Sequence, residues 1–507
     1  MRSSHYLPAL LFFLVLPSAP AGEANRGEIT VMAYNVENLF DVDVISLYAD
    51  VPVQGSTPIR WTPEKLARKL ETIAKVLKGS TADGRGPDLV VLEELEADHT
   101  PESTVSAADF VAAHRDARYH DLLKGKLTPD LEGAPIEAWL MKALEDEGLT
   151  GYTLSTGDIR DLKTEAIRSG VLSRLPVRSV RQHLVEEART IVEVEIDSLG
   201  TPIHLFANHW KSGAGDAALE LVRIGNARVL RTRIDEILKA DPEAAVIVAG
   251  DLNCHYNQAQ RYPYMPKTAI QDTLRSQGNP AKLVSGEADL YNLWYDVTVE
   301  RRGSDTYRGE WGTLMHIIIS RGLADGQGIE YVGGSFHPVI IPGINSRGEG
   351  APPWSWTNYG PGAGCSDHLP VIASFRKLPE GEIKPCPLTR AEVNPAEASS
   401  CYPKNIDRAK LRSAATIAHL GPDGIASAMG ELFLVEGVFQ GGSKPKVRVG
   451  DIDYPVYAAD RNLLAAVKAG EKGAKVSWIG ALGYHKDTLE FEIARPEWIK
   501  DTAATGR

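Results

Sequence analysis

Apolar and polar positions recur along the chain with two periods, one typical of strands and one typical of helices. Short apolar runs rich in β-branched residues predict buried strands. These runs lie at Glu28 to Tyr34, Leu89 to Leu92, Gly170 to Pro176, Ile191 to Ile196, Ile203 to Ala207, Ala245 to Ala249, Thr313 to Ser320 and Val371 to Phe375. Helical spacing of apolar residues predicts one helix from Trp61 to Leu77 and a longer one from Leu219 to Leu238.

Strands alternate with helices near the N-terminus, whereas hairpin-like strand pairs dominate later in the chain. Ile191 to Ile196 and Ile203 to Ala207, for example, flank a turn that contains Gly200 and Pro202. This mixture predicts an α/β sandwich with mixed sheets and argues against a purely parallel, doubly wound sheet. We expect this large domain to cover residues 28–377 of the 507.

The C-terminal part of the chain has a different pattern. Residues 378–412 are rich in Pro, Ala and Glu and are predicted to be a linker, and residues 413–507 are predicted to be a second domain. Its strands are expected at Leu432 to Val438, Lys446 to Val449, Val456 to Ala458, Lys475 to Ile479 and Leu489 to Ile493, and its helix at Asn462 to Ala469. This order predicts a small β-barrel of the OB type, a fold that often binds oligonucleotides. The aromatic residues of this domain suit a stacking surface or a barrel core.

The N-terminus has the features of a secretory signal peptide. Arg2 precedes the apolar run from Leu7 to Leu16, and the small residues Ala19 and Ala21 stand at the positions that a signal peptidase recognises. We expect a signal peptide over residues 1–21, with cleavage after Ala21. Because no later segment is long and apolar enough to cross a membrane, we expect an exported protein without a membrane anchor, in the periplasm or outside the cell.

The four cysteines are compatible with export. A disulfide between Cys386 and Cys401 would close a loop of about 15 residues and contribute roughly 3 kcal/mol. Cys254 and Cys365 stand beside two polar motifs and would form a second disulfide if those motifs meet in space; otherwise they are buried free thiols. The sequence leaves the connectivity open.

The most informative stretch runs from Ala245 to Asn253. A predicted buried strand is followed directly by Gly250-Asp251-Leu252-Asn253. Asp251 and Asn253 are two residues apart, so in an extended chain both side chains point to the same side. A carboxylate beside an amide suits a water molecule held against a phosphate, although the same residues also occur in ordinary turns.

Polar motifs follow predicted strands at several other places in the same domain. The full set is Asn35, Glu94, Asn208-His209, Asp251-x-Asn253 and Ser366-Asp367-His368. Loops at the same edge of packed sheets bring such residues together. Carboxylates and an amide offer only oxygen ligands, which suit a hard cation such as Mg²⁺ or Mn²⁺. The histidines would remain to donate hydrogen bonds to phosphoryl oxygens.

With these motifs in this order, the sequence resembles the endonuclease/exonuclease/phosphatase superfamily, to which pancreatic-type deoxyribonucleases belong. The resemblance covers roughly Glu28 to Phe375. Three segments are particularly similar to the exported bacterial branch of the superfamily: Tyr34 to Asp41, Asn208 to Ser212 and Thr306 to Trp311. The resemblance implies a four-layered α/β sandwich, in which two packed mixed sheets are flanked by helices.

The resemblance also implies a metal site. Glu94 would be the main ligand of a divalent metal, Mg²⁺ or Mn²⁺, with Asn35 and Asp367 close to it. Glu93 stands where the family usually has glutamine, so Glu94 and not Glu93 takes the role of the ligand.

The remaining motif residues would act on the substrate. Asp251 would orient the attacking water, and Asn253 would hold a phosphoryl oxygen. His209 and His368 would contact the scissile phosphate. Further candidates for substrate binding are Asn208 and Arg168. The implied reaction is metal-assisted, in-line hydrolysis of a phosphate ester without a covalent intermediate.

One position departs from the family pattern. The strand before the last motif usually carries an aspartate that hydrogen-bonds the final histidine, and here Met315 stands in that place. A thioether is a weak acceptor, so His368 would lose the partner that fixes its tautomer and raises its pKa. Either Asp296 or Asp305 reaches His368 instead, or activity is reduced, or catalysis is lost and binding is kept. We expect Met315→Asp to raise turnover near neutral pH, and equal or lower turnover in a folded, metal-loaded variant would argue for a substitute partner.

Three functions are compatible with the sequence. The preferred one is an exported metal-dependent phosphodiesterase that hydrolyses nucleic acid, with DNA as the expected substrate. The alternatives are a hydrolase of another phosphate ester (a phospholipid, inositol phosphate or sugar phosphate) and a catalytically weakened protein that binds nucleic acid. A formal net charge of −12 argues against a generally basic nucleic-acid binder but is compatible with a local basic groove. The sequence does not determine the oligomeric state.

Overall fold

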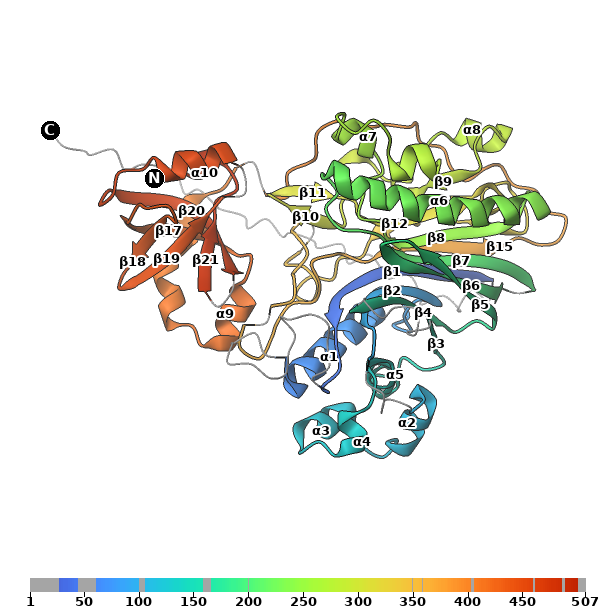
Figure 1. The fold of residues 1–507 in the computed structure, drawn as a ribbon, viewed down its shortest axis with the longest axis horizontal. Coiled ribbons are helices and arrows are strands. Elements are labelled where there is room, and N and C mark those ends of the chain that lie inside the picture. Colours follow the sequence, from blue (N-terminus) through green and yellow to red (C-terminus); the bar gives the residue numbers. More distant parts are fainter. Residues whose placement is uncertain are drawn as a thin grey trace, which may run out of the picture.

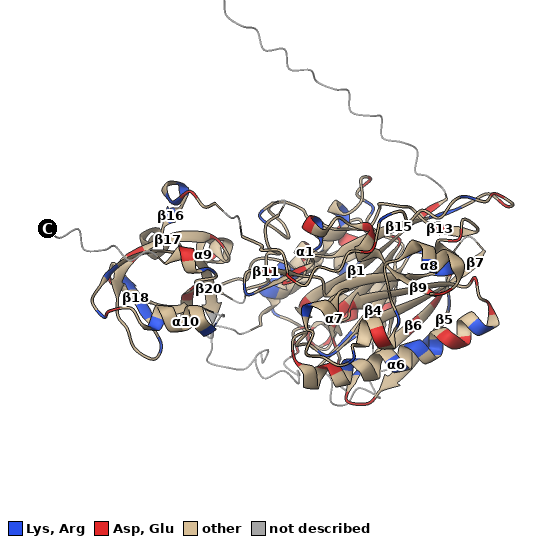
Figure 2. Ribbon diagram, turned by 90° about the horizontal axis from the view of Figure 1, so that it is seen from above, with Lys and Arg blue, Asp and Glu red and all other residues tan. Residues whose placement is uncertain are grey.

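The computed structural model describes residues 27–43, 61–99, 105–157, 166–198, 200–348, 350–357, 359–402, 405–458, 461–485 and 488–499. The signal peptide predicted for residues 1–21 lies outside the described residues. Figure 1 shows a large α/β part and, beside it, a smaller β-rich part formed by the C-terminal residues. Acidic and basic residues are interspersed over both parts (Figure 2). Within the described ranges, no helix is long and apolar enough to cross a membrane.

Two mixed β-sheets form the large part. The strand order in the first sheet is β13 (Ile329–Tyr331), β15 (Val371–Lys377), β1 (Glu28–Leu39), β2 (Leu89–Glu96), β4 (Ile167–Ser173) and β3 (Thr153–Thr156), with β14 (His337–Pro338) paired to β15. In the second sheet it is β5 (Val177–Val185), β6 (Ala188–Ser198), β7 (Thr201–His209), β8 (Ala245–Asp251), β12 (Met315–Ser320) and β9 (Leu290–Asn292). The pairs β1–β2 and β7–β8 are parallel, and the other pairs are antiparallel. The prediction of mixed sheets is confirmed.

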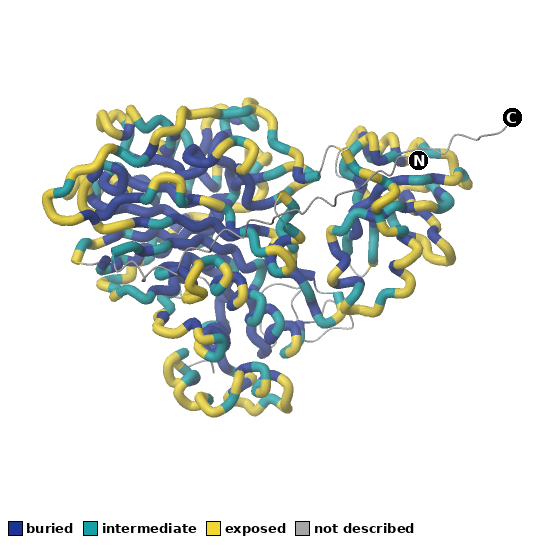
Figure 3. The backbone as a smooth tube through the Cα atoms, turned by 180° about the vertical axis from the view of Figure 1, so that it is seen from behind, coloured by how far each residue is buried: buried dark blue, intermediate teal, exposed yellow. Residues whose placement is uncertain are grey.

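The two sheets pack face to face, and helices cover their outer faces. Apolar side chains from both sheets fill the space between them, among them Val31, Val91, Leu205, Ile247 and Ile317. Helices α1 (Pro63–Gly79) and α5 (Ile136–Asp146) cover the first sheet, and α6 (Ala217–Ala240) covers the second. Figure 3 shows the buried strands at the centre of this part. The four-layered sandwich is therefore confirmed, and it explains why the central strands are apolar on both faces.

Local sequence sets where the two predicted helices begin. The side chains of Thr62 and Asp216 accept hydrogen bonds from backbone N–H groups in the first turns of α1 and α6. Pro63 occupies the start of α1, where its missing N–H group costs nothing. These caps satisfy donors that the first turn of a helix leaves without intrahelical partners. Both helices are confirmed close to their predicted bounds.

The sequence pattern does not predict the helices that follow β2. These are α2 (Ala107–Ala113), α3 (Tyr119–Lys124), α4 (Pro129–Glu132) and the longer α5. The first three have seven, six and four residues, too few for a clear helical period. The ring of Phe110 packs edge-on against Trp139 with 5.0 Å between the ring centroids. Packing against a neighbour thus stabilises helices that are too short to be stable alone.

Several short elements complete the large part. They are α7 (Gln258–Arg261), α8 (Pro280–Ser285), the hairpin of β10 (Asp305–Tyr307) and β11 (Glu310–Gly312), and the turns η2 (Ala269–Thr273), η3 (Leu293–Asp296), η4 (Val299–Arg301) and η5 (Arg321–Leu323). The β10–β11 hairpin lies on the side of the large part that faces the C-terminal part (Figure 1).

The C-terminal residues form a closed β-barrel. Neighbouring strands follow the order β17 (Leu432–Phe439), β18 (Lys446–Val449), β19 (Ile452–Tyr457), β21 (Thr488–Glu492) and β20 (Lys475–His485), and β17 pairs with β20 to close the barrel. Around it lie β16 (Arg412–Ser413), α9 (Pro422–Ala428), α10 (Arg461–Lys468), η6 (Arg408–Lys410), η7 (Ala414–His419) and η8 (Pro496–Trp498). Phe433, Trp478 and Phe491 are buried inside. The predicted small barrel is confirmed, and these three aromatic residues belong to its core.

The first half of the predicted linker packs on the large part. Asn394 Oδ1 accepts a hydrogen bond from Tyr295 Oη at 2.6 Å, and Arg302 donates to the backbone O of Val393 at 2.8 Å. Leu388 is buried in the core between the sheets. This segment therefore extends the surface of the large part, and a composition rich in Pro and Ala does not reveal such packing.

The predicted disulfides are not formed, because all four cysteines are free thiols. Cys254 lies in the core beneath α6, and Cys365 lies in the core beneath α1, on the other outer side of the sandwich. Their motifs meet at one edge, but the sulfur atoms point into different layers. Cys386 packs against the core between the sheets, whereas Cys401 pairs through its backbone N with Gly309 O at 2.9 Å.

Candidate functional site

The predicted polar motifs meet at one edge of the sandwich. Asn35 and Glu94 lie toward the carboxyl ends of the parallel strands β1 and β2. His209 and Asp251 end the parallel strands β7 and β8 of the other sheet. The turn that contains residues 366–368 precedes β15, which pairs with β1. The carboxyl ends of parallel strands are a common place for ligand sites in α/β proteins.

The side chain of Asn35 links the two sheets. Its Nδ2 donates to Glu94 Oε1 at 2.9 Å and to Asp251 Oδ2 at 3.2 Å. The other oxygen of Glu94, Oε2, accepts a hydrogen bond from the backbone N of Asn38 at 2.9 Å. Ser366 Oγ donates to the backbone O of Asn35 at 2.6 Å and so fixes the last motif to the same strand. One amide thus positions carboxylates from both sheets.

The two predicted histidines flank Asp251. His209 Nε2 lies 3.7 Å from Asp251 Oδ2 and 3.8 Å from Glu94 Oε1. His368 Nε2 lies 3.7 Å from the same Asp251 oxygen and 3.7 Å from Asp367 Oδ1. These distances exceed those of hydrogen bonds, so both Nε2 atoms face the carboxylates without being bonded to them.

Unusual backbone conformations gather at this edge. Glu94 and Asn253 have φ angles of 66° and 48°, in the left-handed region that non-glycine residues seldom adopt. Gly250 has a φ of 125°, and a Cβ atom there would lie 2.1 Å from a backbone oxygen of β7. The backbone N of Asn253 donates to Asp251 Oδ1 at 2.8 Å. The side-chain Nδ2 of Asn253 donates to the backbone O of Trp210 at 3.2 Å. Such strain is typical of functional sites.

Carboxylates of different exposure gather at this edge: Asp251 is buried, Glu94 is partly buried and Asp367 is exposed. Burial raises the pKa of Glu94, and the charge of Asp367 raises it further. Burial likewise raises the pKa of Asp251. A divalent cation bound by Glu94, Asp367 and Asn35 would offset this crowding through the oxygen ligands that Mg²⁺ and Mn²⁺ prefer. Glu94 and Asp367 offer such oxygens, whereas Asn35 turns its Nδ2 toward Glu94 and its Oδ1 accepts a hydrogen bond from the backbone N of Glu37 at 2.9 Å.

Glu93 has a different environment from that of its neighbour Glu94. It is fully buried, and a Cβ atom at Gly250 would lie 2.6 Å from its Oε1. Burial, followed by the charge of Asp251, raises the pKa of Glu93 well above the usual value. This shift favours the protonated form of Glu93, which like glutamine would offer both a donor and an acceptor.

The two histidines differ in charge. Burial lowers the pKa of His368, but four neighbouring carboxylates, Asp367 foremost, outweigh burial and raise it to about 9. Burial lowers the pKa of His209 well below its usual value. Near neutral pH the edge therefore presents one charged and one neutral imidazole to a bound group.

The negative charge of Asp305 helps to raise the pKa of His368, but His368 Nδ1 is buried without a hydrogen-bond partner among the described residues. Met315 is buried and offers no carboxylate. Asp305 forms an antiparallel bridge with His368, so the two side chains lie on the same face. Its Oδ1 accepts hydrogen bonds from Ser304 Oγ at 2.9 Å and from Leu314 N at 3.0 Å.

The other alternative from the sequence, Asp296, has its own partners. Its Oδ2 accepts hydrogen bonds from Tyr331 Oη at 2.8 Å and from Gly334 N at 2.6 Å. Of the two alternatives, Asp305 is therefore the one beside His368, through a backbone bridge and through its charge.

The two predicted substrate-binding residues are turned toward other groups. Asn208 Oδ1 accepts a hydrogen bond from Trp210 Nε1 at 3.0 Å. Arg168 is buried, donates to the backbone O of Glu96 at 3.2 Å and forms an ion pair with Glu137. A contact of either residue with substrate stays a prediction.

The structure also contains a second group of carboxylates, which the order of polar motifs does not predict. Asp41, Asp43 and Asp98 are buried and offer oxygen atoms that lie within 4.8 Å of one another. Burial and the charge of Asp43 raise the pKa of Asp41. Burial lowers the pKa of Arg168 to about 10. The negative charge of Asp98 opposes this shift more strongly than that of any other residue. Arg168 therefore interacts with this second group. In the sequence, this group is indicated by Asp41 and Asp43, two aspartates separated by one residue after β1.

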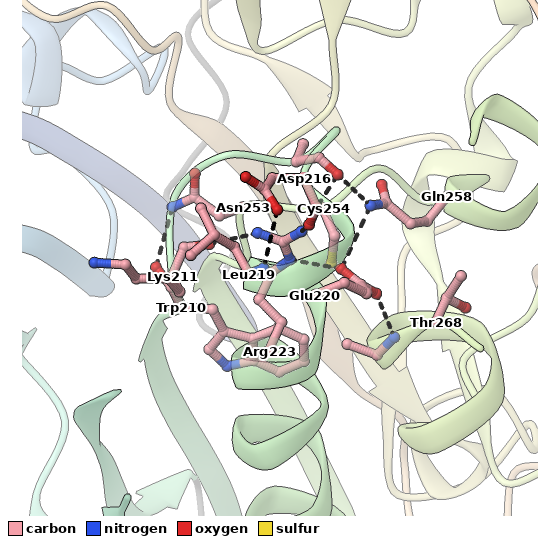
Figure 4. Close-up of polar contacts among 12 residues, drawn as sticks. Trp210, Lys211, Asp216, Leu219, Glu220, Arg223, Asn253, Cys254, Gln258 and Thr268 are labelled. Atoms are coloured by element: carbon pink, nitrogen blue, oxygen red, sulfur yellow. Dashed lines mark hydrogen bonds and ion pairs between the residues drawn. The ribbon is translucent and has the colours of Figure 1, made fainter. Parts of the chain in front are cut away.

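Behind His209, Arg223 of α6 holds the loop that follows β7 (Figure 4). The side chain is fully buried, and its Nε donates to Glu220 Oε2 at 2.7 Å. Its Nη1 donates to the backbone oxygens of Lys211 at 2.8 Å and Gly213 at 3.2 Å. One guanidinium thus fixes the loop to the helix, which a lysine could not do with the same geometry.

One family model matches part of the large domain. Residues 174–377 match the family model described as "Endonuclease/Exonuclease/phosphatase family". The matched region belongs to this family. It contains three of the motifs that meet at the edge, those of His209, Asp251 and His368. The name of the family denotes hydrolases of phosphate esters, and the likeness to its exported bacterial branch stays a prediction.

Solved structures from several organisms are similar to the chain at low sequence identity. An endonuclease/exonuclease/phosphatase from Bacteroides vulgatus is 12% identical over 69% of this chain and 99% of that one, with a TM-score of 0.38. D. rerio TDP2 complexed with single strand DNA product is 13% identical over 69% and 99%, with a TM-score of 0.37. The catalytic domain of human Nocturnin, with bound sulfate anion, is 12% identical over 69% and 95%, with a TM-score of 0.36. No curated protein matches the sequence.

We expect Arg223→Met to lower the free energy of unfolding by about 3–5 kcal/mol, because Glu220 would be left buried without its cationic partner. Urea denaturation at neutral pH measures this change. Arg228→Met, at an exposed position of the same helix, is the matched control and should stay within about 0.5 kcal/mol of the wild type. Equal stability of the two variants would contradict the role of Arg223 in holding the loop.

Proposed function

We propose that the protein is an exported, metal-dependent phosphodiesterase that hydrolyses nucleic acid, with DNA as the expected substrate. The observation that carries the proposal is the convergence of Glu94, Asp251, His209 and His368 around the amide of Asn35. The family of residues 174–377 supports hydrolysis of a phosphate ester. Export rests on the signal-like N-terminus of the sequence.

Asp251 would orient the attacking water. Its Oδ2 lies 3.7 Å from the Nε2 atoms of both His209 and His368, between the two groups that face the substrate. Burial raises its pKa, which makes the carboxylate a better proton acceptor. When held by Glu94, Asp367 and Asn35, Mg²⁺ or Mn²⁺ would supply Lewis acidity to the phosphoryl group.

The two histidines and Asn253 would hold the phosphoryl oxygens. His368, protonated near neutral pH, donates a charged hydrogen bond from Nε2 as negative charge develops. Neutral His209 donates a weaker one from the opposite side. Asn253 uses one N–H of its amide on Trp210 O and keeps the other for the substrate.

The barrel supports nucleic acid as the substrate. A closed five-stranded barrel of the OB type lies beside the large part, and this fold commonly binds oligonucleotides. The alternative esters are a phospholipid, an inositol phosphate and a sugar phosphate. These esters are comparison substrates in the experiment.

The first test is a substrate panel with Mg²⁺, Mn²⁺ or a chelator. We expect the wild type to cleave plasmid DNA, single-stranded DNA or bis(p-nitrophenyl) phosphate only with metal. Glu94→Ala should abolish this turnover, and Asp251→Asn should lower kcat by about 100- to 10,000-fold. Glu186→Ala, at an exposed carboxylate outside the site, is the control. A wild type that leaves nucleic acid intact but cleaves another phosphate ester would overturn the choice of substrate.

A second test concerns the pairing of Asp305 with His368. Asp305→Asn should lower kcat by about tenfold or more, because His368 loses an orienting carboxylate. It should also move the alkaline limb of the pH profile to lower pH, since a neighbouring negative charge holds the pKa of His368 up.

A second substitution, at Met315, can return the carboxylate that Asp305→Asn removes. It lies opposite Asp251 on the neighbouring strand, so an aspartate there would face the same side of the sheet. Met315→Asp in the Asp305→Asn background should restore much of the lost turnover, whereas Met315→Asp alone should leave turnover near the wild-type value. A rise in turnover from Met315→Asp alone would show that Asp305 is not the substitute partner.

A further inference from the structure

A cavity of about 470 Å³ lies between the large part and the barrel. Its lining combines aromatic rings with one cation and one acid, from Trp354, Trp356, Tyr402, Tyr484, Arg347 and Glu492. The volume lies within the range of sites for small ligands, about 300–1,000 Å³. Nothing in the reaction described above uses this cavity.

The cavity adjoins the catalytic edge through two of its tryptophans. The backbone O of Trp354 accepts a hydrogen bond from Cys365 N at 2.7 Å, and the motif that ends in His368 follows Cys365 directly. The backbone N of Trp356 donates to Glu37 Oε2 at 2.6 Å, two residues beyond Asn35. A substrate held at the edge would therefore have its next unit within reach of the cavity.

The β10–β11 hairpin and the barrel form the remaining walls. Thr306, which lines the cavity, follows Asp305, the bridge partner of His368. Arg347 donates to the backbone O of Ser427 at 2.8 Å and so ties the large part to the barrel. The cavity is thus built jointly by both parts, which gives the barrel a place next to the reaction.

The chemistry of the lining matches a nucleobase. Trp354 Nε1 is buried and has no hydrogen-bond partner among the described residues. Glu492, on the barrel side, is partly buried, and burial raises the pKa of its carboxyl group. Arg347 lies over the Trp354 ring, 5.5 Å from its centroid, and Tyr402 packs edge-on against Trp498. An indole donor and a carboxyl group beside such rings can pair with the polar edge of a base while one of its faces stacks on a ring.

We propose that this cavity binds one nucleobase of the substrate strand, next to the scissile phosphate. The inference rests on the proposed function and adds the recognition of a base to it. A phospholipid tail would leave the indole donor and the carboxyl group unsatisfied, and a sugar phosphate lacks the flat rings that stack on aromatic side chains.

Binding without turnover tests the cavity directly. The full chain carrying Asp251→Asn is titrated by calorimetry with 5′-dAMP and with ribose 5-phosphate, which lacks the base. We expect 5′-dAMP to bind more tightly, and Trp354→Ala to weaken its binding by roughly tenfold. Trp354→Phe keeps an aromatic ring but removes the donor, so it should lose less. Tyr457→Ala, at an exposed aromatic of the barrel outside the cavity, should change nothing.

Equal binding of the two ligands, or equal binding of 5′-dAMP by Trp354→Ala and its parent, would overturn the proposal. A kinetic comparison in the active chain separates it from the proposed function. Trp354→Ala should lower the ratio of kcat/KM for a single-stranded oligonucleotide to kcat/KM for bis(p-nitrophenyl) phosphate by roughly tenfold, mainly through KM. A wild type that hydrolyses neither substrate would contradict the proposed function alone, because the titration still decides whether the cavity binds a base.

Discussion

The amide of Asn35 is the interaction on which the site depends. It donates to a carboxylate of each sheet, Glu94 at 2.9 Å and Asp251 at 3.2 Å, and so fixes the edge where the two sheets meet. These carboxylates come close together, and burial raises the pKa of both. Nearby positive charge favours the charged form of such carboxylates. The charged imidazole of His368 supplies part of that charge, and a divalent cation would supply the rest.

The surrounding structure keeps this edge rigid. Glu94 and Asn253 hold backbone conformations that isolated residues avoid, and Gly250 allows β7 and β8 to approach closely. On the far side of β7, the buried guanidinium of Arg223 fixes the loop after His209. Side chains held on strands and braced from behind are positioned more accurately than side chains on free loops. The same rigid edge adjoins the barrel, and the cavity lies between the large part and the barrel.

Much of this arrangement could be predicted from the sequence. Apolar runs located the central strands, because strands buried on both faces are apolar throughout. The order of polar motifs after those strands then indicated that Asn35, Glu94, Asp251 and His368 would meet. What the pattern could not show was the direction of single side chains. Asn208 follows the same logic as His209, yet its amide turns to Trp210.

Other features depend on contacts between distant segments, which leave no local pattern. The short helices after β2 are stabilised by packing such as that of Phe110 on Trp139. The segment after residue 378 looks like a linker in composition but packs on the large part. Asp305, ten residues before Met315, comes beside His368 through a backbone bridge that the sequence pattern does not predict. The thiols of Cys254 and Cys365 point into different layers although their motifs meet.

The most direct measurement of the central claim is calorimetric titration of Mn²⁺ into the wild type, Glu94→Ala and Asp41→Asn. The last variant alters the second group of carboxylates and leaves the catalytic edge intact. The account predicts a Mn²⁺ site in the wild type that Glu94→Ala loses and Asp41→Asn retains. Loss of the site in Asp41→Asn with retention in Glu94→Ala would contradict it, because the cation would then bind away from Asn35 and the carboxylates it joins.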